Sequence, residues 1–391
     1  MSEVIDFTRE LVRIRSTSDV GEAEAAALVA DRMRSFGWEP QVSEVAPGRP
    51  NVVAVIDGGG GPGRTLLFEG HTDVVTEGRR EDWSFDPYGG EIVDGMLRGR
   101  GAADMKGGLA AAIYAAREMQ LRGPFPGRIV VAALVDEEGM MAGAKAFSRT
   151  PLAAEVDGAI IAEPEDGDVC AVAKGALRIR IDLFGTMAHG AMPEHGVSPI
   201  GPIAQLLASL AAYQQELQST HPEHPYLGKV FLTPTVVRAG EFTQLNVIPA
   251  EASIGLDIRT IPGVAHPDLV RRIEDLATEV AERTEGGKPV RAEVSVIDDR
   301  PAVDTAEDDP VVQALAAAHR DETGEEPRFG GVPGATDGTI LTRDAQIATV
   351  VYGPGDKWIA HQRDEEVRVS DIELCQRVFL RAAQRFLEGP R

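Results

Sequence analysis

The sequence predicts an α/β protein of two domains, one of which is inserted into the other. Its 391 residues exceed what one hydrophobic core usually fills. Apolar runs typical of buried strands alternate with helical patterns before residue 176 and after residue 293. The interval between them has the order strand-helix-strand-strand-helix-strand, which is that of a ferredoxin-like fold. We therefore expect a mixed-sheet domain from residues 1–175 and 294–391, and an inserted domain from residues 176–293.

The mixed-sheet domain should begin with two amphipathic helices, over residues 5–14 and 22–36, and contain an alanine-rich helix over residues 109–120. Its expected strands are residues 51–56, 65–68, 128–135, 159–162 and 348–352. The glycine-rich run 58–63 lacks the Lys-Ser/Thr ending of a phosphate loop and precedes a strand. We expect a flexible hairpin turn there.

The inserted domain alternates two kinds of pattern. Residues 178–184 alternate apolar and polar side chains, as in a strand with one buried face. The remaining expected elements are strands over residues 229–237, 247–259 and 290–296, and helices over residues 199–214 and 267–283. Residues 215–226 follow no simple pattern, and we assign them no role.

Composition excludes several classes of protein. Asp and Glu outnumber Lys and Arg by 62 to 39, a net charge of −23, so neither nucleic acid nor an anionic membrane surface is an expected partner. No apolar stretch approaches the roughly 20 residues of a membrane span, and the first residues lack a secretory signal, so we expect a cytoplasmic protein. Two cysteines, Cys170 and Cys375, are too few for a zinc finger or a disulfide framework. A metal site would therefore have to use His, Asp and Glu.

Residue types that bind metals follow several of the expected strands. His71 and Asp73 come directly after one strand, and in an extended segment they project to the same side. Similar positions after other strands are held by Glu137, Glu138, Glu163 and, after a glycine turn, His361; Asp104 lies at a helix start. Each has a simpler interpretation: a histidine packed in the core or at the surface, a solvated acidic turn, or an Asp that caps a helix. Their recurrence favours one site, because open α/β sheets place active sites at the carboxyl ends of their strands.

Two histidines and three carboxylates without thiolates suit a pair of divalent ions. Two ions about 3.5–4 Å apart share a bridging carboxylate and together polarise a carbonyl group. Zinc is the first expectation, with cobalt or manganese as alternatives. Glu137 stands beside a candidate ligand and is surplus to the count, so it is available as general base.

The motifs together resemble the zinc aminoacylase and carboxypeptidase metallopeptidase family, of the acetylornithine deacetylase and succinyl-diaminopimelate desuccinylase type. They are Gly70-His71-Thr72-Asp73, Asp104-Met105-Lys106-Gly107, Asp136-Glu137-Glu138, Glu163-Pro164, Gly185-x-x-Ala188-His189, and Gly353-Pro354-Gly355 with His361. The resemblance runs from about residue 5 to residue 385. It implies a di-zinc hydrolase domain with an inserted lid that also forms a dimer.

The resemblance also implies roles for individual residues. One zinc ion would be held by His71, Asp104 and Glu163, and the other by Asp104, Glu138 and His361. Asp104 would bridge the two ions, Glu137 would be the base, and Asp73 would support His71. Where aminopeptidase members tend to have Asp, this chain has Glu163, as the deacylases and carboxypeptidases do.

Within the insertion, the resemblance assigns His189 to the oxyanion of the transition state. Arg259 would grip a substrate carboxylate, although an ion pair with Asp257 on the same strand is the simpler interpretation. Further candidates for substrate binding are Asn246 in the insertion and, in the second part of the mixed-sheet domain, Gly334 and Thr336. The remaining histidines are expected to be solvated, namely His195, His221, His224, His266 and His319.

The expected function is the hydrolysis of the amide bond of a small N-acyl amino acid by a homodimer that pairs through its lids. Two alternatives stay open. A carboxypeptidase or dipeptidase would use the same chemistry on a longer acyl half. A non-catalytic binding protein would be expected to lack at least one member of the ligand set.

Overall fold

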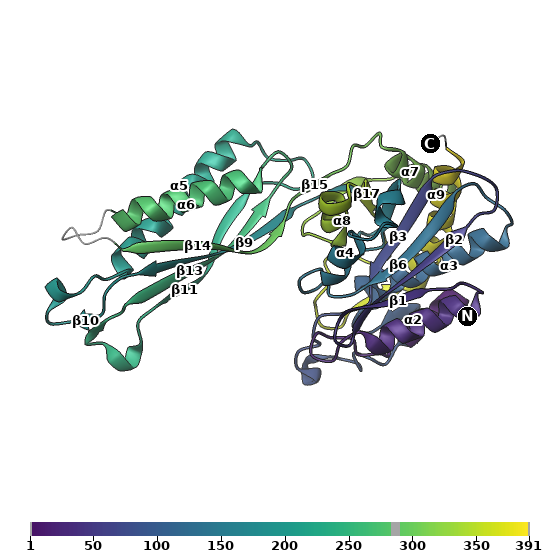
Figure 1. The fold of residues 1–391 in the computed structure, drawn as a ribbon. Coiled ribbons are helices and arrows are strands. Elements are labelled where there is room, and N and C mark those ends of the chain that lie inside the picture. The colour runs from purple at the N-terminus through teal and green to yellow at the C-terminus, as the bar shows by residue number, and fades with distance from the viewer. Residues whose placement is uncertain (1, 283–289, 390–391) are drawn as a thin grey trace. The chain divides into compact units, whose positions relative to one another are not determined.

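The computed structural model describes residues 2–282 and 290–389 (Figure 1). The chain forms two compact units. Unit 1 contains Met1–Val172, Asp304–Val332 and Thr336–Arg391, and unit 2 contains Ala173–Val303 and Pro333–Ala335. No helix of the described residues is long and apolar enough to cross a membrane.

Unit 1 is built on a mixed sheet with the strand order β1-β2-β6-β3-β7-β17-β8-β15, in which β16 also pairs with β8 (Figure 1). The strands are β1 (Gln41–Ala46), β2 (Arg49–Asp57), β3 (Thr65–His71), β6 (Arg128–Leu134), β7 (Gly158–Ile161), β8 (Val169–Ala173), β15 (Val303–Asp304), β16 (Phe329–Val332) and β17 (Thr349–Val351). The central strands β6, β3, β7 and β17 are parallel neighbours. Their carboxyl ends therefore lie at one edge of the sheet, which is where ligand-type residues follow them in the sequence.

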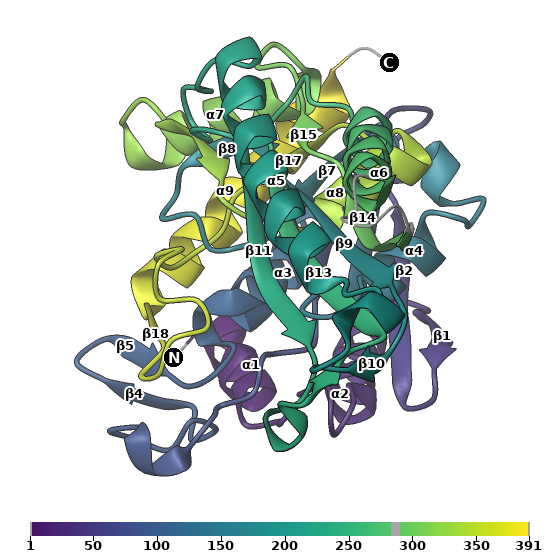
Figure 2. The same ribbon diagram turned by 90° about the vertical axis from the view of Figure 1, so that its left-hand side faces the viewer.

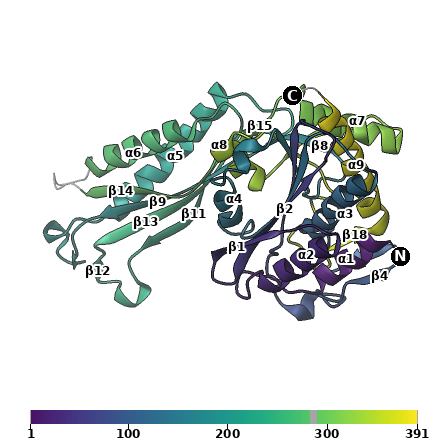
Figure 3. The same ribbon diagram turned by 45° about the vertical axis from the view of Figure 1, so that its right-hand side comes forward.

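Helices cover both faces of this sheet, which explains why β3 is buried throughout and why β6 is apolar and buried after Arg128. The larger layer (Figure 3) packs into one core and comprises α1 (Glu3–Val12), α2 (Ala23–Ser35), α3 (Gly107–Leu121), α7 (Pro310–Thr323) and α9 (Val369–Glu388). On the other face lie α4 (Ala142–Phe147) and α8 (Asp337–Ala345). Apolar residues of α1 illustrate the periodicity that drives this packing: Val4, Phe7 and Leu11 recur every three to four residues and are buried.

The glycine-rich run 58–63 does not form the predicted hairpin turn. The two strands it joins, β2 and β3, do not pair, because β6 lies between them and bonds to both. The run instead packs along the backbone before β6, where the Phe125 amide donates to the Gly58 carbonyl at 2.9 Å. A Cβ at Gly58 would lie 2.0 Å from the Phe125 carbonyl oxygen, so the glycine permits this close approach.

Unit 2 has the predicted order of elements (Figure 2). They are β9 (Gly175–Phe184), α5 (Ile200–Thr220), β11 (Phe231–Ala239), β13 (Glu251–Thr260), α6 (His266–Glu282) and β14 (Arg291–Arg300). The sheet order is β11-β13-β9-β14 and every pairing is antiparallel, as in a ferredoxin-like fold. The last residue of the helix predicted over residues 267–283 lies outside the described part of the chain, as do residues 284–289, which precede the strand predicted from residue 290.

The alternation in β9 decides which face of the unit 2 sheet is covered. Leu177, Ile179, Ile181 and Leu183 are buried, while the intervening Arg178, Arg180 and Asp182 point to the opposite face. Both helices lie on the apolar face (Figure 1). A short two-stranded pairing of β10 (Ala188–His189) with β12 (Val247–Ile248) completes the unit.

Candidate metal centre and active site

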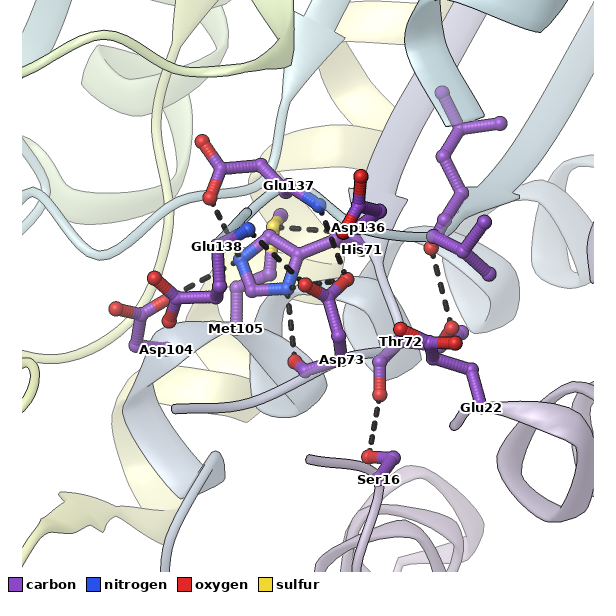
Figure 4. A network of polar contacts seen from close by, with 12 residues as sticks. Ser16, Glu22, His71, Thr72, Asp73, Asp104, Met105, Asp136, Glu137 and Glu138 are labelled. Carbon is purple, nitrogen blue, oxygen red and sulfur yellow. Dashed lines mark hydrogen bonds and ion pairs between the residues drawn. The ribbon is translucent and has the colours of Figure 1, made fainter. Parts of the chain in front are cut away.

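The carboxyl ends of three parallel strands bring the first candidate ligands together, and Figure 4 shows those at the ends of β3 and β6. His71 is the last residue of β3, Glu137 and Glu138 follow β6, and Glu163 follows β7. Asp104 reaches the same place from the turn that precedes α3. This convergence follows from the strand order, because neighbouring parallel strands end side by side.

His71 is completely buried, and its two ring nitrogens face different partners. Nε2 lies 3.2 Å from Asp104 Oδ1 and 3.4 Å from Glu163 Oε1. Nδ1 lies 3.0 Å from the backbone carbonyl oxygen of Asp73, closer than the 3.7 Å to the Asp73 carboxylate. The carbonyl group therefore fixes the ring, and Nε2 is the nitrogen left for a ligand role.

The carboxylate of Asp73 has another task. Its two oxygens accept the backbone N–H groups of Glu137 and Glu138, at 3.3 and 3.0 Å (Figure 4). A buried carboxylate thus holds the turn that carries both glutamates. Sequence reasoning placed Asp73 beside His71, but this second contact depends on how β3 and β6 pair.

Asp104 lies between the two histidines. Its Oδ1 faces His71, and its Oδ2 lies 3.3 Å from Nε2 of His361. The same His361 nitrogen is 2.9 Å from Glu138 Oε2, and the side chain is 55% exposed. The alternative that Asp104 caps α3 does not hold, because α3 begins at Gly107 without a side-chain cap. Its carboxylate has the position of a group shared by two sites.

In the described part of the chain, two groups of side chains could each hold a metal ion, because the potential ligand atoms within each group lie within 4.8 Å of one another. One is His71, Asp104 and Glu138, and the other is His71, Glu137 and Glu163. Glu137 thus lies among the candidate ligands, with Oε2 4.0 Å from His71 Nε2. All these side chains, together with His361, belong to unit 1.

The cluster concentrates negative charge in the protein interior. Burial raises the pKa of Glu137 and Glu138, and burial together with the Asp104 charge raises the pKa of Glu163 to about 8. Hydrogen bonds that the His361 ring donates to the carboxylates of Asp104 and Glu138 raise the pKa of His361 to about 10. Among the residues that the structure describes, the ion-pair partners of these carboxylates are the two imidazoles. Such a set of oxygen and nitrogen donors fits divalent cations, which would supply the missing positive charge.

A second network of hydrogen bonds, centred on Asp136, supports the turn that carries Glu137 and Glu138. Asp136 has a φ of 66°, and its carboxylate accepts N–H groups from Met140 at 3.1 Å and Ala142 at 3.3 Å. Arg49 joins this carboxylate to the buried Glu22 (Figure 4 labels both acids). The sequence signal for Asp136 was its place in the acidic triplet, but nothing in the sequence linked it to Arg49 or Glu22.

Glu69 is a further acid that sequence reasoning missed. It is 1% exposed within β3, two residues before His71, and burial followed by the charge of Asp337 raises its pKa. Its position directly after the strand predicted over residues 65–68 was the available signal. Thr336, a predicted substrate contact, caps α8 by accepting the Gly338 amide hydrogen at 3.2 Å.

The candidates of the insertion lie in unit 2, and so does Gly334. The pairing of β10 with β12 brings His189 and Asn246 together, since the Gly190 amide donates to the Asn246 carbonyl at 2.7 Å. Both side chains are exposed. Arg259 forms the ion pair considered from the sequence, with Nε 2.6 Å and Nη2 3.2 Å from the Asp257 oxygens.

Lys174 was not singled out from the sequence. Its Nζ lies 5.3 Å from the centre of the Phe231 ring, and Phe231 is the cross-strand partner of Arg259. Burial and then the charge of Arg259 lower the pKa of Lys174. Lys174 thus lies near an aromatic ring and near a second cation, Arg259, in a chain of net charge −23. The only sequence signal was a lysine inside an apolar run.

The expectation that the remaining histidines are solvated was wrong for His266. That side chain is buried, with Nε2 2.8 Å from Thr260 Oγ1 and Nδ1 2.5 Å from Asp299 Oδ1. His319 is half-buried against the Tyr352 hydroxyl at 3.0 Å. His195 is exposed, whereas His221 and His224 are half-buried. Sequence reasoning had no means of placing His266 between the ends of two strands.

Comparison with known proteins gives a consistent result. The model of peptidase family M20/M25/M40 matches residues 67–385. The chain is 31% identical to a succinyl-diaminopimelate desuccinylase of Methylobacterium nodulans, over 98% of this chain and 96% of that protein. It is 32% identical to the desuccinylase of Stenotrophomonas maltophilia, over 99% and 100% of the two chains.

Solved structures share the fold. The aminopeptidase PepT of Bacillus cereus aligns with a TM-score of 0.79 at 21% identity, over 98% of each chain. The YXEP protein of Bacillus subtilis, a dinuclear metal-binding peptidase, aligns with a TM-score of 0.73 at 18% identity, over 99% of this chain and 98% of that one. These matches confirm the predicted fold class and the resemblance seen in the sequence motifs. The chain belongs to peptidase family M20/M25/M40.

Proposed function

We propose that this protein is a metal-dependent hydrolase that removes the acyl group from an N-acyl amino acid. The observation that carries the proposal is the Asp104 carboxylate, which places one oxygen against His71 and the other against His361. A carboxylate between two imidazoles, with further buried glutamates around it, is suited to a pair of cations. The desuccinylases among the relatives are named after succinyl-diaminopimelate, a compound whose acyl group is succinyl.

The donor set divides between two cations. His71, Asp104 and Glu163 would hold one, and Asp104, Glu138 and His361 would hold the other. When bound, the pair would polarise the amide carbonyl and lower the pKa of a water molecule. Zinc is our first assignment, with cobalt or manganese as alternatives. The count of two rests on the donor set, in which the Asp104 carboxylate faces both His71 and His361.

Glu137 would act as the general base. Its carboxylate would take a proton from the attacking water and later deliver that proton to the amide nitrogen as the C–N bond breaks. Burial raises the pKa of Glu137, which brings it nearer the range in which a carboxyl group can both take and return a proton. The N–H bonds to Asp73 would hold Glu137 in place during both steps.

Unit 2 would bind the charged parts of the substrate. Arg259 and Lys174 offer two cations for a substrate carboxylate, and the Phe231 ring provides an apolar wall beside them. We assign Asn246, Gly334 and Thr336 to further contacts with the substrate. We also propose a homodimer, in which His189 of the partner subunit stabilises the oxyanion.

The alternative activity is that of a carboxypeptidase or dipeptidase, which differs only in the acyl half. Some proteins of the same fold are peptidases, including the PepT aminopeptidase, but at 21% identity the likeness concerns the fold. The two relatives reported above, at 31% and 32% identity, are desuccinylases, which favours the deacylase.

A panel of amides tests the proposal. Purified protein should hydrolyse N-succinyl or N-acetyl amino acids faster than dipeptides, lose activity on chelation and regain it with Zn²⁺ or Co²⁺. The Glu137→Ala variant should keep its metal and lose activity by about 10²–10⁴-fold, because only the base is removed. Full turnover by metal-free protein would contradict the proposal, and loss of metal in Glu137→Ala would make Glu137 a ligand.

A further inference from the structure

A buried ion pair lies beside the candidate metal centre and has no place in the chemistry above. It joins Arg100, which is 2% exposed, to Glu365, which is fully buried. Arg100 Nη1 lies 2.6 Å from Glu365 Oε2. A buried pair of this kind has to recover the cost of removing two charges from water, so its further contacts are informative.

Strand pairing brings the two residues together. Strand β5 (Met96–Arg98) pairs with β18 (Glu366–Arg368) in the register Arg98 to Glu366. The pairing continues with the Gly99 amide, which donates to the Glu365 carbonyl at 2.9 Å. Arg100 follows at once, and its guanidinium lies 5.1 Å from the centre of the Trp83 ring, which covers it.

Glu365 holds the backbone of Asp104. Its Oε1 accepts the N–H groups of Ala103 at 2.9 Å and of Asp104 at 3.1 Å. Asp104 is thereby held through its backbone, while the two oxygens of its carboxylate face the imidazoles. Hydrogen bonds to a charged acceptor are the strong ones, so this anchor is a firm one.

Arg100 holds the backbone of His361. Its Nη2 lies 3.4 Å from the His361 carbonyl oxygen, while Nη1 donates to Glu365. One ion pair therefore contacts the main chain of both Asp104 and His361, which come from distant parts of the sequence. Their nearest side-chain atoms, Asp104 Oδ2 and His361 Nε2, are 3.3 Å apart.

We propose that Arg100 and Glu365 are positioning residues that fix the distance between Asp104 and His361, and so set the affinity of the cation site to which both contribute. The inference rests on the proposed function, because it assumes that these two side chains bind a cation. Neither positioning residue touches the substrate or the reacting atoms. Their loss therefore acts through the ligands.

The Glu365→Gln variant tests the pair. Glutamine keeps the shape and can still accept the two N–H groups, but its amide NH₂ would face the donors of Arg100. The matched control is Glu366→Gln, which removes the neighbouring ion pair with Arg98 on the same two strands, where both side chains are 31% exposed. The probes are Zn²⁺ and Co²⁺, titrated into metal-free protein in competition with a chelator.

We expect Glu365→Gln to bind one of the two ions about 10–100-fold more weakly and to lose kcat in proportion at limiting metal. Excess metal should restore kcat, and KM should stay unchanged throughout. Glu366→Gln should bind both ions as the wild type does. The assays are run at a temperature at which the variant stays folded, so that a general loss of stability does not lower kcat. Restoration of kcat by excess metal then indicates a positioning role.

Wild-type affinity for both ions in folded Glu365→Gln would overturn the inference while leaving the proposed function intact. A wild-type protein that binds no divalent ion would instead refute the proposed function. If Glu365→Gln does not fold, Arg100→Lys gives the measurement. Lysine keeps the charge, but its single ammonium group replaces the guanidinium group that reaches both Glu365 and His361. Weaker binding of one ion is therefore again expected, and unchanged binding overturns the inference.

Discussion

Replacing Asp73 by Asn separates two roles for this side chain. The sequence suggested that the carboxylate supports His71, whereas the structure gives that contact to the backbone carbonyl, at 3.0 Å, and gives the carboxylate to the turn of Glu137 and Glu138. In the variant the backbone carbonyl is unchanged. His71 should therefore keep its orientation, and the turn should lose its anchor.

The magnitude follows from the hydrogen bonds lost. The carboxylate accepts two N–H groups, and an asparagine keeps one acceptor oxygen and presents NH₂ to the other N–H. One charge-assisted bond at a site 2% exposed is lost, which costs about 1.5–3 kcal/mol of folding free energy. For a unit of this size, that corresponds to a melting temperature lower by about 3–10 °C. A displacement of Glu137 by about 1 Å should lower kcat about 100-fold.

Three measurements on one preparation test the reasoning, namely thermal unfolding, kcat on the best substrate and metal content. Asp157→Asn is the control, because Asp157 Oδ2 also accepts a backbone N–H, that of Thr65 at 2.8 Å, at the opposite end of β3. It should lose stability with unchanged kcat. We expect Asp73→Asn to retain at least the ion at His71. Loss of both ions would return Asp73 to the role of supporting His71, and unchanged stability and kcat would refute both roles.

Two further predictions concern binding. Arg259→Ala should raise KM by about 10–100-fold for substrates with a free carboxylate and leave metal content and kcat unchanged. The reason is that a carboxylate contact in unit 2 contributes to binding. If the KM values of variant and wild type are equal, Arg259 is only the ion-pair partner of Asp257. Metal binding should release protons and weaken as the pH falls from 8 to 6. His361, with a pKa of about 10, and Glu163, with a pKa of about 8, both hold protons at neutral pH that a cation must displace. Calorimetry in two buffers of different ionisation enthalpy measures the protons released, and a pH-independent affinity would contradict the assignment of these ligands.

The sequence predicted best those features that depend on local patterning. The apolar run of β6 and the alternation of β9 each specify a strand directly, because side chains repeat every two residues. The motif residues around His71 and Glu163 could be placed at strand ends for the same reason. The sequence did not predict which strands are neighbours in the sheet. The run 58–63 looked like a hairpin because β2 and β3 are consecutive in the sequence. In the sheet, however, β6 lies between them and is hydrogen-bonded to both.

Contacts that support the site were beyond the sequence for a related reason. Glu365 could be read as one of several acids after His361, but its contact with the Asp104 backbone arises only when β18 pairs with β5. Lys174 likewise gains significance from Phe231 and Arg259. These two residues are partners across β11 and β13, and Lys174, directly before β9, lies near them because β9 also pairs with β13. Such residues carry no spacing signal, because their partners are set by register across strands and not by distance along the chain.

The division of candidates between the two units leads to the most demanding prediction, a shared active site. All candidate metal ligands and Glu137 lie in unit 1, and the exposed His189 lies in unit 2. If His189 of the partner subunit completes each site, His189→Ala and Glu137→Ala homodimers should both be inactive with their metal bound. After subunit exchange, one cleft of each heterodimer would combine a native Glu137 with a native His189 from the other chain. Random exchange makes half the dimers heterodimers with one working cleft in two, so about a quarter of wild-type activity should return. If mass spectrometry verifies the exchange but activity does not recover, the shared site is refuted, and an active monomer at assay concentration would refute it as well. A histidine acting within its own chain cannot restore activity, because it is absent from every cleft that keeps Glu137.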